Sequence, residues 1–386
     1  MEDLDWYKCR FLESAENLKP LVRARIGRTP STALAREIAA CLQQGRLFYE
    51  AAQRAPLELR PLQQFYGMVG FAKALILGRQ LTRLATLPQA HGLSDVSGLD
   101  FRIADLKAKI QYRGIFQKFN DVVKSLNRIR YFDGQSTPRT AYLCSTGSEQ
   151  LDGLELSLRE VLSRIPNLQS LFFNTFGELA NTDFVSLDDI TLPGCWSIRI
   201  DDRELFTDRQ SIRNIVVQWR NRFPFLNSWR FTSAQHAWGN SVIMFADTAN
   251  VAFDEFAEET LVLGPNGYSA TVNPAGVAGR PPLPLDRLSP LAGGYSTSAG
   301  QFAISPIAGN IYLSEFSLHF MALFILSSLV RYRTPTWAHA ISRTSISDAP
   351  ADDQALALIE RFLELNAEVV PSFVVTVLNP NEDRYA

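Results

Sequence analysis

The stretch from Ala55 to Leu77, APLELRPLQQFYGMVGFAKALIL, constrains the fold more than any other part of the sequence. It begins with prolines, which a helix tolerates in its first turn because the N–H there has no partner within the helix. After them, apolar side chains recur every three or four residues on two adjacent stripes. These are Leu62, Phe65, Val69, Ala72 and Ile76 on one stripe, and Met68, Phe71 and Leu75 on the other. The pattern predicts a helix that is buried between neighbouring elements.

Two glycines and one lysine stand out in this predicted helix. Gly67 and Gly70 each cost about 1 kcal/mol relative to alanine inside a helix, so we expect another helix to approach closely there. Lys73 is the one charged residue between Phe65 and Leu77. Its stem can lie on apolar surface with the ammonium in water. Alternatively, an inward-facing Lys73 would hold an anionic ligand or a partner carboxylate.

The same stretch resembles the signature of the YaaC-like family of bacterial proteins, in the pattern APLxxxPLxxFYGxxxxxKALIL. Further features match that family in the same order along the chain: His91-Gly92, Arg113-Gly114-Ile115-Phe116, Leu326-Ser327, Arg331-Tyr332 and Trp337. The similarity extends from Arg46 to Leu378, with a middle that matches poorly. The resemblance implies a mostly helical, intracellular protein from a family without an agreed activity. It transfers no catalytic residues to this chain.

Composition narrows the class of protein. Of the 386 residues, 46% are hydrophobic, which is enough for a packed core, and the length allows one large domain or several. The formal net charge of -2 gives no general attraction to nucleic acid or to an anionic membrane. The four cysteines are widely spaced without a CxxC pair, which fits a reducing compartment. The N-terminus, MEDLDWYKCR, lacks the basic and apolar regions of a signal peptide, so we expect a cytoplasmic protein.

The most apolar run, Phe316 to Val330, contains three serines and a histidine. It is shorter than the roughly 20 apolar residues that span a membrane. We therefore interpret it as a buried core helix and expect no membrane association.

Other helices are expected from apolar periodicity and capping residues over residues 1–30, 33–52, 116–127, 157–165, 314–331 and 351–369. In the middle of the chain, alternation with period two predicts strands near 196–201, 229–233, 241–246, 260–263 and 268–272. Turns at Gly239-Asn240 and at Gly264–Gly267 predict two hairpins. A helix over 212–219 is expected to start from a capping box of Thr207 and Gln210. Residues 279–294, rich in proline and glycine, are typical of a linker.

The expected fold is mainly α, of the α+β class. It has a helical N-terminal part over 1–185, a small β-rich insert over 186–294 and a helical C-terminal part over 295–386. Neither the Ala55–Leu77 helix nor the Phe316–Val330 run has enough sequential neighbours to cover it. We therefore predict that the two helical parts pack together as one helical core.

Strong catalytic motifs are missing from the sequence. It contains no GxxxxGK[ST], no GxGxxG after a strand, no HExxH and no GxSxG, and its four histidines offer few general bases. No cluster of cysteine and histidine has the spacing of a metal site. We therefore predict neither a cofactor nor a metal.

One short motif suggests catalysis. Arg333 and His339 have an R-x5-H spacing that resembles the motif of HEPN ribonucleases, and the FYGMVGFAKALIL helix is similar to one in HEPN-like proteins. An arginine would hold the scissile phosphate and a histidine would move the proton of the 2′-OH of RNA. Against this, Pro335 lies within the motif, and the segment also fits a helix C-terminus closed by Trp337.

Two further clusters are candidates for binding. His91 follows Pro88 in a loop, and together with Lys73 and Arg331 it would form an anionic-ligand pocket between the helical parts; alternatively, it caps a backbone group. Arginines and aromatic residues interleave from Arg209 to Arg230, with Arg213, Trp219, Arg220 and Trp229 as the proposed interface or nucleic-acid contacts. The alternative is a solvated basic face.

These observations favour a cytoplasmic YaaC-like protein that binds a partner or a small anion as an accessory or regulatory subunit. The partner would be another protein or a second copy of the chain. The alternative hypothesis is an HEPN-like, metal-independent ribonuclease that acts as a toxin effector in antiviral defence.

Overall fold

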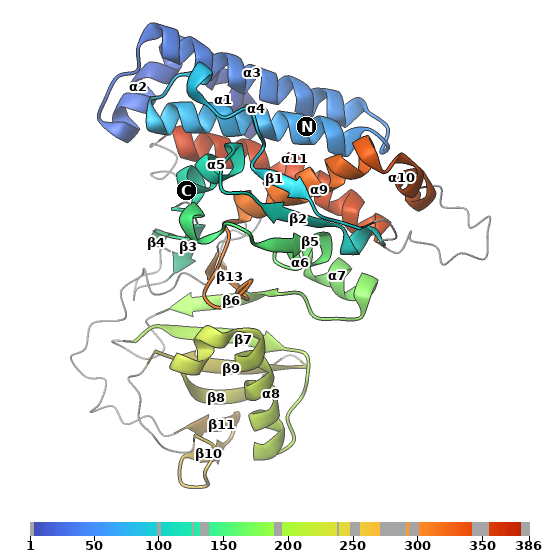
Figure 1. Ribbon diagram of the computed structural model, residues 1–386. Coiled ribbons are helices and arrows are strands. Elements are labelled where there is room, and N and C mark those ends of the chain that lie inside the picture. Colours follow the sequence, from blue (N-terminus) through green and yellow to red (C-terminus); the bar gives the residue numbers. More distant parts are fainter. Residues whose placement is uncertain are drawn as a thin grey trace. The chain divides into compact units, whose positions relative to one another are not determined.

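The computed structural model describes residues 4–98, 102–125, 127–131, 139–188, 195–237, 239–247, 255–270, 291–292, 301–341 and 355–379 (Figure 1). The chain divides into two compact units. The first, here called the helical unit, comprises Met1–Leu126, Thr146–Ala180 and Leu313–Ala386. The second, the sheet unit, comprises Asn127–Ser145 and Asn181–Tyr312. The helical N- and C-terminal parts therefore pack as one helical core, as the sequence predicted.

The boundaries of these units differ from the predicted ones at 185/186 and 294/295. The hairpin of β3 (Asn127–Tyr131) and β4 (Arg139–Leu143) belongs to the sheet unit, although it lies within the predicted N-terminal part. The second segment of the sheet unit begins at Asn181 and ends at Tyr312. Most of the predicted linker over 279–294 lies outside the described residues.

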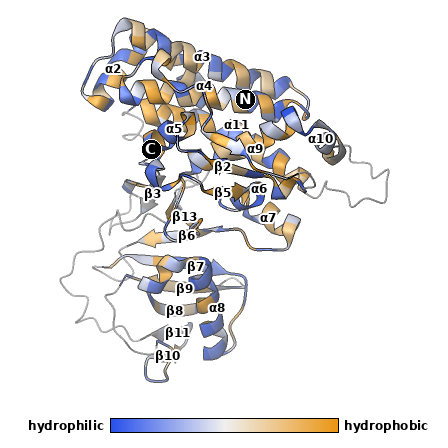
Figure 2. Ribbon diagram, viewed as in Figure 1, coloured by the Kyte–Doolittle hydropathy of each residue, from blue (hydrophilic) through white to orange (hydrophobic). Residues whose placement is uncertain are grey.

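In the helical unit, the helices are α1 (Leu4–Leu12), α2 (Ala15–Ile26), α3 (Thr32–Arg54), α4 (Arg60–Gln80), α5 (Ile115–Val123), α6 (Leu158–Leu162), α7 (Gln169–Phe176), α9 (Glu315–Tyr332), α10 (Thr334–Ile341) and α11 (Leu356–Leu378). A three-stranded antiparallel sheet accompanies them, in the order β1 (Leu93–Asp95), β2 (Lys107–Ile110), β5 (Glu155–Ser157). In Figure 2, hydrophilic and hydrophobic residues alternate along α3, as expected of a helix with one face on the core.

The predicted Pro-started helix is α4, and it lies at the centre of this unit. It contacts α3, α5, α9 and α11. Residues of both predicted stripes are buried, among them Phe65, Met68, Phe71 and Ile76, each at 0% exposure. The prediction of a helix buried between neighbours is confirmed.

Glycines bring α3 and α4 into close contact. A Cβ atom on Gly67 would lie 2.6 Å from the ring of Tyr49, and one on Gly70 would lie 3.0 Å from the Cα of Gly45. Any larger residue at these positions would push the two helices apart. The expected close approach of another helix is confirmed, and that helix is α3.

The long apolar run forms α9, which is buried from Glu315 to Leu329. The side chain of Ser314 caps it by accepting a hydrogen bond from the backbone N–H of Ser317, 3.1 Å away. In the described part of the chain, no helix is long and apolar enough to cross a membrane. Helix α11 continues through Pro371 to Leu378, beyond the predicted end at residue 369.

A chain of buried polar side chains crosses the core between α3, α11 and α9. Tyr49 Oη donates a hydrogen bond to Asn366 Oδ1 at 2.7 Å, and Asn366 Nδ2 lies 2.9 Å from His319 Nδ1. Since the amide nitrogen only donates, His319 Nδ1 accepts, and the ring proton is on Nε2. That nitrogen lies 3.8 Å from Glu315 Oε1. Burial raises the pKa of Glu315, while the neighbouring His319 opposes the rise.

The sheet unit contains an eight-stranded antiparallel sheet in the order β10-β11-β8-β9-β7-β6-β13-β12. Its strands are β6 (Thr182–Asp188), β7 (Ser197–Asp202), β8 (Arg230–Ala237), β9 (Asn240–Ala246), β10 (Leu261–Gly264), β11 (Gly267–Ala270), β12 (Leu291–Ala292) and β13 (Gln301–Ile304). Helix α8 (Arg209–Arg222) shares a hydrophobic core with the sheet. Both predicted hairpins, β8–β9 and β10–β11, are confirmed.

The start of α8 differs from the prediction. The cap is Asp208, whose side chain accepts a hydrogen bond from the backbone N–H of Ser211 at 2.8 Å. In return, Ser211 Oγ accepts from the N–H of Asp208 at 3.0 Å. The predicted pair of Thr207 and Gln210 is therefore wrong by one residue, because the aspartate carboxylate is the stronger acceptor for the unpaired N–H groups.

A candidate anion site in the helical unit

The backbone of His91 is held in place by two glycines. Gly92 has a φ of +81°, which favours glycine, and a Cβ on Gly114 would lie 2.1 Å from the Cα of Gly92. This contact brings the start of α5 onto the His91 carbonyl, which accepts a hydrogen bond from the N–H of Phe116 at 2.9 Å. Only glycine fits at both positions, because the two backbones are in contact. This packing fixes the backbone of His91 and therefore the position of its Cα.

The imidazole of His91 is half-buried against two aromatic rings. Its centroid lies 5.1 Å from that of Phe65 on α4 and 6.4 Å from that of Phe324 on α9, both in edge-to-face geometry. The Nδ1 atom is buried and has no hydrogen-bond partner within the described residues. Burial lowers the pKa of His91, and the positive charges of Arg331 and Lys73 lower it further. These three effects all favour the neutral form of the imidazole.

Arg331 approaches the same site from the end of α9. Its guanidinium carbon lies 5.8 Å from the centre of the Phe65 ring and 4.8 Å from that of Tyr332. Its Nε donates to the carbonyl of Ser327 at 3.2 Å, Nη1 donates to the hydroxyl of Tyr332 at 3.4 Å, and Nη2 contacts the hydroxyls of Ser327 and Ser328. Across the described ranges, no carboxylate forms an ion pair with Arg331.

Lys73 is half-buried on α4 and acts on His91 through its charge. Within the part of the chain that the structure describes, Lys73 has no ion-pair or hydrogen-bond partner. The positive charges of Lys73 and Arg331 thus both act on the imidazole of His91, and no described acidic group pairs with either cation. Such a set of donors is suited to an oxyanion.

The thiol of Cys41 is buried near the charge of Lys73. Cys41 on α3 is 4% exposed, and burial raises the pKa of its thiol to about 11, although the charge of Lys73 acts in the opposite direction. The thiol is therefore protonated at neutral pH. The cluster offers hydrogen-bond donors and positive charge, and Cys41 adds no nucleophile to it.

The Arg333–His339 motif spans two helices. Arg333 follows the last residue of α9, and His339 lies on α10, which begins at Thr334 with Pro335 in its first turn. The guanidinium of Arg333 donates to the carbonyls of Gly98 at 2.7 Å and Ser97 at 2.9 Å. It also pairs with Asp95 at 3.3 Å.

These contacts give Arg333 a structural role, since they tie the loop after β1 to the end of α9. The side chain of His339 lies outside the described part of the structure. Trp337 is 2% exposed and donates its Nε1–H to the carbonyl of Glu58 at 3.0 Å. The segment thus has the contacts of a helix end closed by a tryptophan.

The arginine–aromatic cluster of the sheet unit is part of its core rather than an exposed platform. Trp219 and Trp229 are only 5% and 4% exposed, and the indole N–H of Trp219 donates to Asp202. Arg220 pairs with Glu255 at 2.8 Å and donates to the carbonyl of Trp229 at 2.8 Å. Of the four proposed contact residues, Arg213 alone is exposed. The two indoles are too buried to stack on a base.

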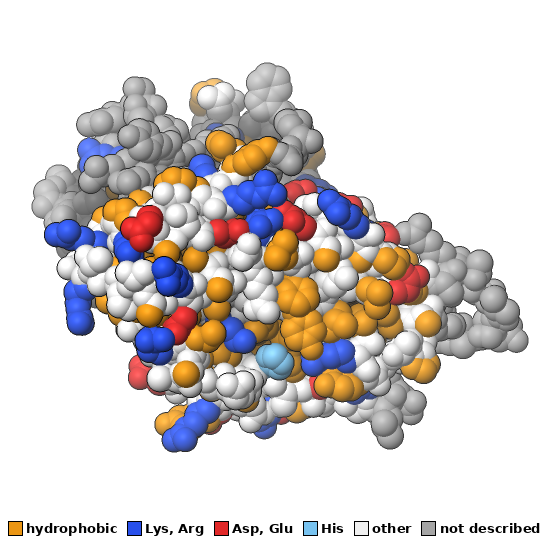
Figure 3. Space-filling model, turned by 90° about the horizontal axis from the view of Figure 1, so that it is seen from above, with side chains coloured by type: hydrophobic (Ala, Val, Ile, Leu, Met, Phe, Trp, Pro, Cys, Tyr) orange, Lys and Arg blue, Asp and Glu red, His pale blue; other side chains and the backbone are white. Residues whose placement is uncertain are grey.

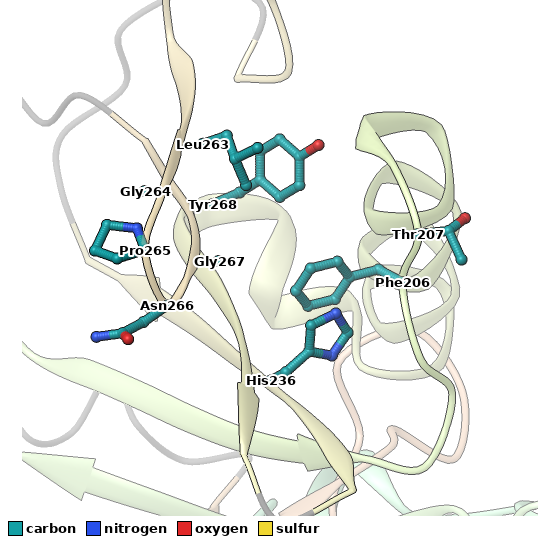
Figure 4. A pocket seen from close by; sticks show the side chains of 9 residues that line it. All are labelled: Phe206, Thr207, His236, Leu263, Gly264, Pro265, Asn266, Gly267 and Tyr268. Carbon is teal, nitrogen blue, oxygen red and sulfur yellow. The ribbon is translucent and has the colours of Figure 1, made fainter.

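The sheet unit also contains a pocket of about 400 Å³ that the sequence analysis missed (Figure 4). His236 stacks on Phe206 with ring centroids 3.9 Å apart, and Tyr268 meets Phe206 edge-on at 6.0 Å. The turn from Gly264 to Gly267 forms another wall. Among the described residues that line it, none is a lysine, arginine or carboxylate, so this pocket lacks the charge of the helical unit's site.

On the outside of the helical unit, hydrophobic side chains gather in the middle of the face seen from above (Figure 3). The exposed hydrophobic residues of this unit include Leu47 on α3, at 50% exposure, and Tyr66 on α4, at 36%. The ring of Phe48 lies 5.7 Å from that of Tyr66. A hollow of about 370 Å³ on α3 lies between Ala40 and Ala51.

Comparison with known proteins gives a match to the family described as YaaC-like Protein, over residues 10–378. The chain belongs to the YaaC-like family. No curated protein and no solved structure matches it. In this YaaC-like chain, several residues that carry the resemblance have the contacts described above. Gly92 and Gly114 pack against each other beside His91, the charge of Arg331 acts on His91, and Trp337 donates to the carbonyl of Glu58.

Proposed function

We propose that this YaaC-like protein binds a small anion at Lys73, His91 and Arg331 and acts as an accessory or regulatory protein. One observation carries the proposal. The positive charges of Lys73 and Arg331 act on a half-buried imidazole that has an unpartnered nitrogen, and no described carboxylate pairs with either cation. A bound oxyanion would supply the missing negative charge and accept hydrogen bonds from the two cationic side chains.

The electrostatics of the site favour occupancy. Like charges close together in a partly buried site repel one another, and at an effective dielectric constant of about 20 two unit charges 4 Å apart interact by about 4 kcal/mol. An anion placed between the cations converts this repulsion into attraction. The aromatic walls of Phe65 and Phe324 limit solvent access, which strengthens the interaction further.

A binding role rather than a catalytic one is supported by what surrounds the site. Cys41 has a protonated thiol, and the donors of Arg333 are used in holding the loop after β1. As an accessory or regulatory subunit, the protein would transmit occupancy of the site to a protein partner or to a second copy of the chain.

Isothermal titration calorimetry with sulfate and with inorganic phosphate tests the proposal. The wild-type chain is compared with Lys73→Met and Arg331→Met, which retain much of the apolar stem but lose the charge. Each lost charge-assisted hydrogen bond is worth about 1.5–3 kcal/mol, so we expect the affinity to fall by about 10- to 100-fold.

Two charge-matched controls separate the site from general electrostatics. Lys19→Met removes a lysine that pairs with Glu16 on α2, and Arg361→Met removes an arginine that pairs with Glu364 and Glu368 on α11. Both controls should bind sulfate like the wild type. If no anion binds, or if Lys73→Met and Arg331→Met bind like the controls, the proposal is wrong.

A further inference from the structure

We propose that the site selects a doubly charged oxyanion and takes up a proton at His91 when that anion binds. This inference rests on the proposed function and adds to it the class of ligand and its coupling to pH.

Groups from α4 and α9 act on or contact the imidazole of His91. Lys73 comes from α4 and Arg331 from α9, and these are the charged groups that act on His91. Phe65 and Phe324, from the same two helices, present ring edges. The residues of α5 that close on the His91 backbone are uncharged. Within the described ranges, therefore, no carboxylate is among the groups that act on His91 and would stabilise its protonated form.

In the free protein, Lys73 and Arg331 contribute two positive charges, and a third on His91 would be repelled by both. A dianion between them cancels those two charges and leaves oxygen atoms that can accept from the ring. Protonation then provides a donor at both ring nitrogens, including the unpartnered Nδ1. A monoanion leaves one positive charge uncancelled, so the imidazolium is still opposed.

If the bound state holds the His91 proton more tightly than the free state, lowering the pH must tighten anion binding through thermodynamic linkage. The free-state pKa lies below the usual value because of burial, Arg331 and Lys73, and the bound dianion raises it. Affinity should increase as the pH falls through the bound-state pKa and level off below the free-state pKa. Between the two, a single proton changes affinity by at most about tenfold per pH unit.

Sulfate is the probe of choice because it keeps both charges between about pH 5.5 and pH 8, so any pH dependence belongs to the protein. Calorimetry in buffers of different ionisation enthalpy measures the number of protons taken up per sulfate. We expect the wild type to take up close to one proton per sulfate at a pH midway between the free-state and bound-state pKa of His91. The monoanion nitrate should bind more weakly and cause less proton uptake.

His91→Gln is the decisive variant. It should still bind sulfate through Lys73 and Arg331, at reduced affinity, but take up no proton and lose the pH dependence. In parallel, the ¹H–¹³C signals of the imidazoles give the pKa of each histidine with and without sulfate. The pKa of His91 should rise on binding.

The outcomes separate the two proposals. Sulfate binding by the wild type without proton uptake, or with uptake that His91→Gln retains, overturns this inference and leaves the proposed function standing. Nitrate binding as tight as sulfate overturns the selection of a dianion. If neither anion binds, the proposed function fails and this inference fails with it. A thermal melt of His91→Gln confirms that the variant is folded.

Discussion

Replacing Tyr49 by phenylalanine tests the buried polar chain of the helical core. The substitution removes one oxygen and leaves the ring in its place, where it packs 5.6 Å from Phe71 and 5.5 Å from Trp6. The substitution removes the hydrogen bond of 2.7 Å that Tyr49 Oη donates to Asn366 Oδ1, so this oxygen loses its donor. Asn366 is 0% exposed, so water does not readily replace that donor.

The expected cost follows from leaving a buried acceptor unpaired, which is about 1–3 kcal/mol. For a domain of this size, that corresponds to a fall in melting temperature of about 2–10 °C. Because the chain has two units, we would follow the unfolding of the helical unit by far-UV circular dichroism, where the helices dominate the signal.

A matched control is Tyr66→Phe, the same change on α4 at a tyrosine that is 36% exposed. It should shift stability by less than about 0.5 kcal/mol. Replacing the hub of the chain, in Asn366→Leu, should cost more than Tyr49→Phe, because it strands both Tyr49 Oη and His319 Nδ1. If Tyr49→Phe is as stable as Tyr66→Phe, the reasoning about this network is refuted.

Three further predictions follow from contacts in the same unit. Gly70→Ala should destabilise the protein by as much as about 2 kcal/mol, because its Cβ would lie 3.0–3.2 Å from the backbone of α3 and this strain outweighs the gain of about 1 kcal/mol in helix propensity, as equilibrium unfolding in urea would show; stabilisation by about 1 kcal/mol, the value for an open helix position, would contradict the close approach. Arg333→Met should speed hydrogen exchange in the loop after β1 by removing its anchor; exchange as slow as in the wild type would argue against that role. Glu315→Gln should alter the pH dependence of stability. Burial raises the folded-state pKa of Glu315, so the wild type loses stability as pH rises from about 4.5 through that pKa, and the variant should lack this loss. Parallel slopes of unfolding free energy against pH for the two proteins would refute it.

Local sequence patterns were sufficient to predict many of the elements. The Pro-started helix, its two buried stripes and the glycines that admit α3 all follow from spacing and from the properties of proline and glycine. The hairpin turns at Gly239 and Gly264 were predicted for the same reason, because turn residues act within a few positions. The cap of α8 was missed by one residue, since several polar side chains there compete for the same N–H groups.

Properties that depend on distant residues were decided by the tertiary structure. Trp219 and Trp229 are interleaved with arginines in the sequence, yet the packing of α8 on the sheet buries both. The hydrogen bond from Tyr49 to Asn366 joins residues 317 positions apart in the sequence, and no local sequence pattern predicts it. Likewise, only the fold shows that the charges of Lys73 and Arg331 act on His91. Periodicity and turn chemistry act over short stretches of chain, whereas burial and charge balance are set by whichever residues the fold brings alongside.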